Sequence, residues 1–265
     1  MPEALFPPTP RFIYDKSPLI EVVCQLRFPQ ILRIDAQPPA EFQDSIRHEF
    51  PLLERQSQQF PQLPAEFAQF LGARMGNAHL FLTEDRSATL SLASDAIGLT
   101  VNRYTRWEEF RDKFFGPLRS LVRIYAPAFF SRVGLRYSDL IDPQQLGMPT
   151  EKWSHLIRPS ILGEIAETEF EDNLEALQHI VRFRFPDGSG SVLLQHGLAQ
   201  APGIDRAYKI DFDFFNDKKT EVNDAETVLN RFNRRAGDAF RWFITDKLHR
   251  ALGPTEIPAV SASII

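Results

Sequence analysis

The sequence has one cysteine, Cys24, and no hydrophobic run long enough to cross a lipid bilayer. A single cysteine excludes a disulfide framework and a zinc site of the Cys-x-x-Cys kind. The N-terminal residues include neither the basic region nor the apolar region of a secretion signal. These absences predict a soluble protein of the reducing cytoplasm, in which Cys24 is an inert thiol of the core.

Motifs for nucleotide binding, nucleophilic catalysis and metal binding are also missing. Gly-x-Gly-x-x-Gly and Gly-x-x-x-x-Gly-Lys do not occur. Gly188-Ser189-Gly190 joins two predicted strands, whereas a nucleophile elbow joins a strand to a helix. The six histidines never lie two or four residues apart, the spacings of ready metal sites. The sequence therefore favours a protein that is not an enzyme and holds no cofactor or metal.

Positive charge is in slight deficit. The chain has 30 Lys and Arg against 35 Asp and Glu, which gives a net charge of -5 and a pI near 5.7. A protein of this charge has no overall attraction for phosphate backbones. Any nucleic-acid site would have to be a local basic patch.

Apolar residues are plentiful. They make up 43% of the 265 residues, and charged residues make up 25%, which excludes disorder for the bulk of the chain. Phenylalanine is unusually common, with 23 Phe against 5 Tyr and 3 Trp. Because Phe has a large apolar area and no polar group, this excess indicates a core between a sheet and helices. It would equally serve the interface of a homodimer.

Hydrophobic periodicity predicts the elements of the first half. An extended lead-in over 1–18 precedes a strand over 19–28. Phe42, Ile46, Phe50 and Leu53 recur at helical spacing, and a Gln- and Pro-rich surface excursion follows over 54–77. The half ends with three strands over 78–83, 88–93 and 97–104 and a long helix over 107–125, kinked at Gly116-Pro117.

The second half repeats this order. It comprises a strand over 129–140, a short helix over 151–157, strands over 176–185, 192–199 and 207–215, and a long helix from about Asn223 to Pro254. A tail over 254–265 follows. The prediction is a single α+β domain over 19–253, with an antiparallel sheet backed by two long helices. The shared order β-α-β-β-β-α makes 19–127 and 128–253 the possible halves of a duplication.

Two carboxylates stand out in the last strand. Asp211 and Asp213 lie two residues apart, so both project from the same face of a strand. Paired carboxylates can hold a divalent ion or act as acid and base. Arg182 and Arg184 show the same alternation on a nearby strand, and opposite charges across strands are a common way to cover an exposed sheet face. The sequence favours the charged face.

One basic cluster follows from the strand alternations. Its members all point away from the helix-packed face of the sheet, and they are Arg27, Arg132, Arg136, Arg182, Arg184 and Lys209. Planar guanidinium groups could bind a phosphate or a carboxylate through paired hydrogen bonds. The alternative is a solvated face of salt bridges with Glu21, Asp211 and Asp213.

Three stretches resemble the recurring motifs of a protein family. They are Ser17-Pro18-Leu19-Ile20-Glu21-Val22-Val23-Cys24-Gln25-Leu26-Arg27-Phe28, Trp107-Glu108-Glu109-Phe110 and Arg132-Val133-Gly134-Leu135-Arg136-Tyr137. The family is sporadically distributed among bacteria, of about this length and of uncharacterised function, so the resemblance implies no catalytic residues. The family's patchy distribution suggests mobile or defence-related loci. The sequence departs from the motif at Ser138-Asp139, where the family has an apolar residue and then Asn.

Three functional hypotheses remain from the sequence. The first is a non-enzymatic cytoplasmic binding or adaptor protein that acts through a protein partner, using the exposed sheet face or the stretch 54–77. The second is an RNA- or nucleotide-binding protein that uses the arginine face, and its binding would weaken steeply with salt. The third is an enzyme with Asp211 and Asp213 as metal ligands.

Overall fold

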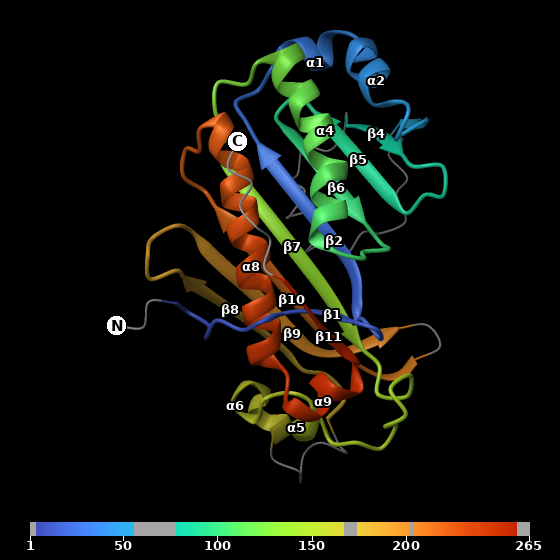
Figure 1. The fold of residues 1–265 in the computed structure, drawn as a ribbon, viewed down its shortest axis with the longest axis vertical. Coiled ribbons are helices and arrows are strands. Elements are labelled where there is room, and N and C mark those ends of the chain that lie inside the picture. The colour runs from blue at the N-terminus through green and yellow to red at the C-terminus, as the bar shows by residue number, and fades with distance from the viewer. Residues whose placement is uncertain (1–3, 56–77, 167–173, 202–203, 259–265) are drawn as a thin grey trace. The chain divides into compact units, whose positions relative to one another are not determined.

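The computed structural model of the chain describes residues 4–55, 78–166, 174–201 and 204–258 (Figure 1). Its strands are β1 (Arg11–Tyr14), β2 (Leu19–Arg27), β3 (Leu52–Arg55), β4 (His79–Leu82), β5 (Ala88–Ala93), β6 (Ala96–Val101), β7 (Arg132–Ile141), β8 (Gln178–Arg184), β9 (Ser191–Ala201), β10 (Ile204–Asn216) and β11 (Pro254–Ile257). Its helices are α1 (Leu32–Ala36), α2 (Ala40–Ile46), α4 (Trp107–Tyr125), α5 (Trp153–Leu156), α6 (Pro159–Leu162), α8 (Ala225–Phe243) and α9 (Asp246–Ala251), with short turns of 3-10 helix at η2 (Gly163–Ala166) and η3 (Val222–Asp224).

The strands form one large sheet and one small one. Nine of them are hydrogen-bonded in the order β3-β4-β5-β6-β2-β7-β10-β9-β8, and β1 pairs with β11. The pairs β3–β4, β4–β5, β5–β6, β2–β6 and β8–β9 are all antiparallel. A large antiparallel sheet accompanied by helices confirms the predicted α+β class.

The chain forms two compact units. Unit 1 contains Met1–Ile20, Tyr137–Phe214 and Asn230–Ile265, and unit 2 contains Glu21–Arg136 and Phe215–Leu229. These bounds differ from those of the predicted halves, because β2, β7, β10 and α8 each run from one unit into the other. The duplication stays a prediction.

In unit 2, α4 covers one face of the strands. The helix begins and ends where the apolar stripe predicts, and it continues through Pro117. It buries residues spaced three or four apart, namely Trp107, Phe110, Phe114, Leu118 and Leu121. The strand register aligns Cys24 with Leu99 and Leu99 with Leu90, and all three are fully buried. Each of the two buried leucines contributes about 1.5–3 kcal/mol of hydrophobic stabilisation.

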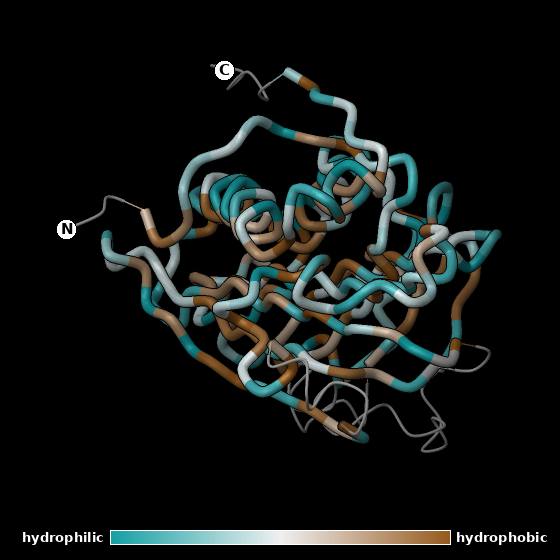
Figure 2. The backbone as a smooth tube through the Cα atoms, turned by 90° about the horizontal axis from the view of Figure 1, so that it is seen from below, coloured by the Kyte–Doolittle hydropathy of each residue, from teal (hydrophilic) through white to brown (hydrophobic). Residues whose placement is uncertain are grey.

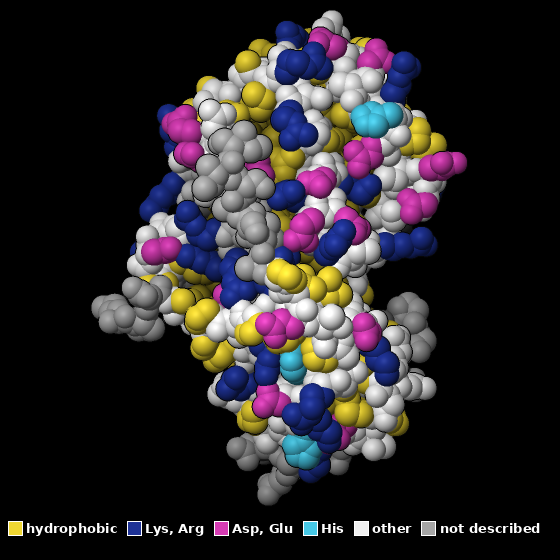
Figure 3. Space-filling model, viewed as in Figure 1, with side chains coloured by type: hydrophobic (Ala, Val, Ile, Leu, Met, Phe, Trp, Pro, Cys, Tyr) yellow, Lys and Arg dark blue, Asp and Glu magenta, His cyan; other side chains and the backbone are white. Residues whose placement is uncertain are grey.

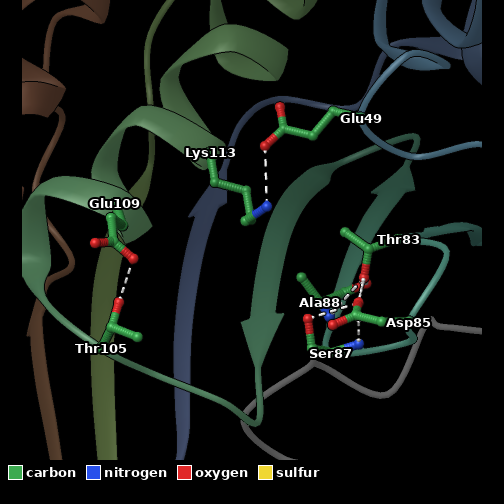
Figure 4. Close-up of polar contacts among 8 residues, drawn as sticks. All are labelled: Glu49, Thr83, Asp85, Ser87, Ala88, Thr105, Glu109 and Lys113. Atoms are coloured by element: carbon green, nitrogen blue, oxygen red, sulfur yellow. Dashed lines mark hydrogen bonds and ion pairs between the residues drawn. The ribbon is translucent and has the colours of Figure 1, made fainter.

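Polar contacts hold the turn between β4 and β5 and join α4 to the segment after α2 (Figure 4). Asp85 makes the turn between β4 and β5, where its Oδ1 accepts from the Ser87 N–H at 3.0 Å and from the Thr83 hydroxyl at 2.8 Å. These hydrogen bonds, chiefly the one from the Ser87 backbone, lower the pKa of Asp85 to about 2. Lys113 on α4 donates to Glu49, which follows α2, at 3.1 Å. Asp85 thus holds the turn that joins the two strands.

In unit 1, α8 covers one face of β9 and β10. The Phe232 ring on this helix lies 6.3 Å from Phe185 and 6.5 Å from Phe214, and the Phe243 ring lies 5.7 Å from Phe212. Helices in Figure 2 carry hydrophilic residues on the outer side and hydrophobic residues on the side toward the strands. The excess of phenylalanine therefore fills a core between sheet and helix, as predicted.

Two predicted helices are shorter in the structure. The helix predicted to include Phe42 and Leu53 ends at Ile46, and Leu53 lies in β3. Pro51 explains this, because the residue before a proline is disfavoured in the helical region. The long terminal helix ends at Phe243, and Thr245 caps a second helix by accepting at Oγ1 from the Leu248 N–H at 3.3 Å.

The chain ends belong to unit 1. The lead-in over 1–18 includes β1, which pairs antiparallel with β11 of the tail. Asp238 on α8 accepts from the Thr9 N–H at 2.9 Å, and the Tyr14 hydroxyl lies 3.0 Å from His249 Nδ1. No helix in the described ranges is long and apolar enough to cross a membrane. Residues 56–77, most of the predicted surface excursion, lie outside the described residues.

Candidate functional site

Three of the predicted arginines belong to unit 2, and two of them are largely buried. Arg132 on β7 lies with its guanidinium 5.0 Å from the centre of the Phe215 ring and its Nε 3.5 Å from Asp217 Oδ1. Only 16% of its side chain is exposed. Arg136 is 5% exposed, and Arg27 on β2 is half-buried. These side chains serve packing within the protein more than contact with a large polyanion.

Gly134 explains how Arg132 can lie flat on the sheet. A Cβ at this position would come within 2.3 Å of the Arg132 Nη1 atom. Glycine at the second residue after Arg132, on the same face of β7, leaves the space that the guanidinium fills. In the sequence Arg-Val-Gly-Leu-Arg, the glycine therefore allows the Arg132 side chain to lie against the strand.

The remaining predicted residues belong to unit 1, on the face of the strands that α8 does not cover. The β8–β9 register pairs Val181 with Leu194 and Phe183 with Val192. Val192 is fully buried, on the side of the strands that α8 covers. Arg182 and Arg184 alternate with the two β8 residues of these pairs and so point to the opposite face. On β10 the residues facing α8 are even-numbered, which places Lys209, Asp211 and Asp213 on that opposite face as well. We name this the polar face of unit 1.

The two carboxylates at the centre of the polar face are buried. Asp211 is 4% exposed and Asp213 is 8% exposed. The Ser138 hydroxyl donates to Asp211 Oδ2 at 3.3 Å, and Lys209 Nζ lies 4.0 Å from the same oxygen. No three His, Cys, Asp or Glu residues in the described ranges converge as metal ligands. This arrangement favours a structural charge network over a metal site.

The edge of the polar face is exposed. The strand β8 is the last of the nine-stranded order, and both Arg182 and Arg184 are exposed on it. Three large apolar side chains on the same strand are also exposed, namely Ile180 by 60%, Val181 by 37% and Phe183 by 36%. The structure therefore does not gather the six predicted basic residues into one accessible cluster, because it buries those of β7 and exposes those of β8.

Charged side chains of both signs surround α4 in unit 2 (Figure 3). Acidic and basic side chains are interspersed there (Figure 3). Exposed pairs such as Arg123–Glu41 at 3.1 Å and Arg106–Glu109 at 2.9 Å account for the mixture. Exposed pairs of this kind contribute little to stability or binding.

Asp139, which in the sequence is only a departure from the family motif, is a buried carboxyl in the structure. It is 3% exposed on β7, beside Ser138. Burial raises the pKa of Asp139 from 3.8 to about 8, and the charge of Asp211 makes a smaller contribution in the same direction. At neutral pH the carboxyl is therefore mostly protonated. No sequence pattern could have identified it, because strand alternation does not show that this strand is buried on both faces.

Two histidines meet across the strands β8 and β9. His179 pairs directly with His196, and their rings stack with centroids 5.1 Å apart. His196 Nδ1 lies 2.8 Å from the Tyr208 hydroxyl, and His179 Nε2 lies 3.7 Å from Glu164 Oε2. The sequence gives no signal for this pair, because the two residues are neighbours only through strand register.

The acid stability of the protein is expected to depend on His196. Burial lowers the pKa of His196 from 6.5 to about 4, and the charge of His179 makes a smaller contribution in the same direction. Between these pH values the unfolded chain takes up a proton that the folded protein does not, so the unfolding free energy falls by up to about 3 kcal/mol as pH falls. Denaturant titrations should show a smaller loss for His196→Asn, whose side chain does not titrate, and an unchanged loss for exposed His48→Asn. Parallel curves for the wild type and His196→Asn would contradict this expectation.

Comparison of the chain with models of known protein families gives no match, and a search of curated proteins finds no significant match.

Proposed function

We propose that this protein is a non-enzymatic cytoplasmic binding module that acts through a protein partner. The observation that supports the proposal is the exposed strand β8, which presents Ile180, Val181 and Phe183 together with two arginines. Exposed apolar side chains grouped among polar ones are typical of protein interaction sites. Interfaces are enriched in arginine, which binds partner carboxylates through paired hydrogen bonds.

Burial of the other arginines argues against nucleic-acid binding as the main function. Phosphate backbones are bound by several accessible Lys and Arg side chains. Arg136 is 5% exposed and Arg132 is already stacked on Phe215. With a net charge of -5 the protein lacks compensating long-range attraction.

Affinity capture from the host tests the proposal. The tagged wild type is expected to retain one protein in stoichiometric amount, and Arg182→Glu/Arg184→Glu is expected to reduce that retention at least about tenfold because it places like charges in the interface. The matched control is Arg47→Glu/Arg103→Glu, which makes the same charge change at two exposed arginines of unit 2. Retention of the partner by the β8 variant would contradict the proposal. Capture of nuclease-sensitive RNA in its place would favour RNA binding.

A further inference from the structure

Strand order is the first observation. In unit 2 the strands run outward from β2 as β6, β5, β4 and β3, and in unit 1 they run outward from β7 as β10, β9 and β8. The strands β4 and β8 therefore occupy equivalent positions. The outer edge of β4 is covered by the antiparallel strand β3, with Leu53 opposite Phe81. No described strand covers the outer edge of β8.

Backbone direction along β8 is the second observation. The Phe185 N–H donates to the Gly190 carbonyl at 2.9 Å across the hairpin. Hydrogen-bonded residues alternate along an antiparallel pair, so Phe183 and Val181 bond to β9. The backbone N–H and C=O groups of Ile180 and Arg184 consequently point to the outer edge. An edge of this kind can take up an additional strand.

The side chains of β8 indicate what strand would fit. Ile180, Arg182 and Arg184 lie on the polar face, while Val181 and Phe183 lie on the other face. A second copy of β8 is disfavoured, because antiparallel self-pairing brings the arginines of both copies to one face, and like charges there repel. A strand whose acidic residues alternate with apolar ones would match both faces.

We infer that β8 binds a protein partner by strand addition, taking an extended acidic and apolar segment as an antiparallel neighbour. This inference rests on the proposed function and specifies the chemistry of its partner. Backbone hydrogen bonds to the open edge supply affinity, and carboxylates opposite the arginines supply specificity. The equivalent contact within the protein is that of β3 with β4.

A synthetic peptide tests the backbone contact directly. The probe is a peptide as long as β8 in which glutamate and valine alternate, and the matched control has lysine in place of glutamate. The Glu-Val peptide, added up to about 1 mM, is expected to protect the amides of Ile180 and Arg184 from hydrogen exchange at least about tenfold. The Lys-Val peptide is expected not to protect them. Absence of protection by the Glu-Val peptide would overturn the inference.

Two variants at one position separate strand addition from side-chain contact. Ile180→Pro removes an outward N–H without removing a β8–β9 hydrogen bond, since proline is tolerated at such edge positions. Ile180→Ala removes the side chain and keeps the N–H. Peptide affinity is expected to fall at least about tenfold more in Ile180→Pro than in Ile180→Ala. Equal losses would overturn the inference. If Ile180→Pro does not fold, a peptide N-methylated at alternate residues makes the reciprocal test, with the same expected loss.

The outcomes distinguish this inference from the proposed function. In one outcome, a partner is captured by the wild type and lost in Arg182→Glu/Arg184→Glu, but the Glu-Val peptide gives no protection. This outcome would support the binding function and contradict strand addition. Protection by the peptide without any captured protein would retain the binding chemistry of β8 and remove the proposed function. The isolated protein could instead form a dimer that the Glu-Val peptide dissociates. That result would show that β8 binds a second copy of this chain, and it would overturn the inference that its partner is a different protein.

Discussion

The variant Asp139→Asn is expected to raise the free energy of unfolding by about 4 kcal/mol at pH 7, and by more at pH 8. In the folded protein the pKa of Asp139 is about 8, against 3.8 for the unfolded chain, so folding at neutral pH takes up a proton. One pKa unit corresponds to about 1.4 kcal/mol. Asparagine is neutral and of the same size, so it removes this cost.

The sign of the pH dependence follows from the raised pKa. The contribution of Asp139 to stability is fully present below pH 4 and is lost as pH rises toward 8. The difference between the variant and the wild type should therefore be near zero at pH 4 and grow steadily to pH 8. Urea titrations across this range measure it. The matched control Asp112→Asn changes an exposed carboxyl of α4 and should shift stability by less than about 0.5 kcal/mol. A difference that does not vary with pH would contradict the expectation.

A second large effect is expected at Gly197. A Cβ there would lie 1.9 Å from the carbonyl oxygen of Leu177, which is backbone and has no easy way to move aside. Gly197→Ala should therefore lower the unfolding free energy by about 2–4 kcal/mol. Since Gly197 pairs with Gln178, the change should also loosen the first residues of β8.

Denaturant titration and hydrogen exchange over 177–184 check the prediction for Gly197. The control Gly237→Ala lies on α8 with no atom within 4 Å of the added Cβ, and alanine there should stabilise the helix by about 0.5–1 kcal/mol. Equal behaviour of the two variants would show that the close approach at Leu177 is relieved at little cost. In that case the backbone of the first residues of β8 can move away from the added Cβ at little cost.

Elements with a strong local pattern were predictable. The helix α4 begins and ends at Trp107 and Tyr125 as its apolar stripe indicates, because helix periodicity is a property of neighbouring residues. The turns at Asp85 and Asp187 follow from side chains that accept from the backbone two residues on. The extended lead-in contains β1, whose pairing could not be predicted because its partner β11 lies far away in the sequence.

The candidate site was predictable only in part. Strand alternation, with the register of β8 and the ring contacts of β10, assigns Arg182, Arg184 and Lys209 to the face that α8 does not cover. Alternation gives no information about coverage, so the burial of Arg136 and the stacking of Arg132 on Phe215 could not be foreseen. The accessible part of the site is therefore smaller and nearer the sheet edge than the sequence indicates.

The sequence by itself determined the class of fold, the position of most elements and the faces of the strands, because these depend on periodicity over a few residues. Tertiary structure alone decided that β8 is the last strand of the nine-stranded order in the described residues, that Asp139 is buried and that His179 meets His196. These features depend on strand order and register. Strand order and register are set by contacts between residues far apart in the chain, whose free energies no local pattern records.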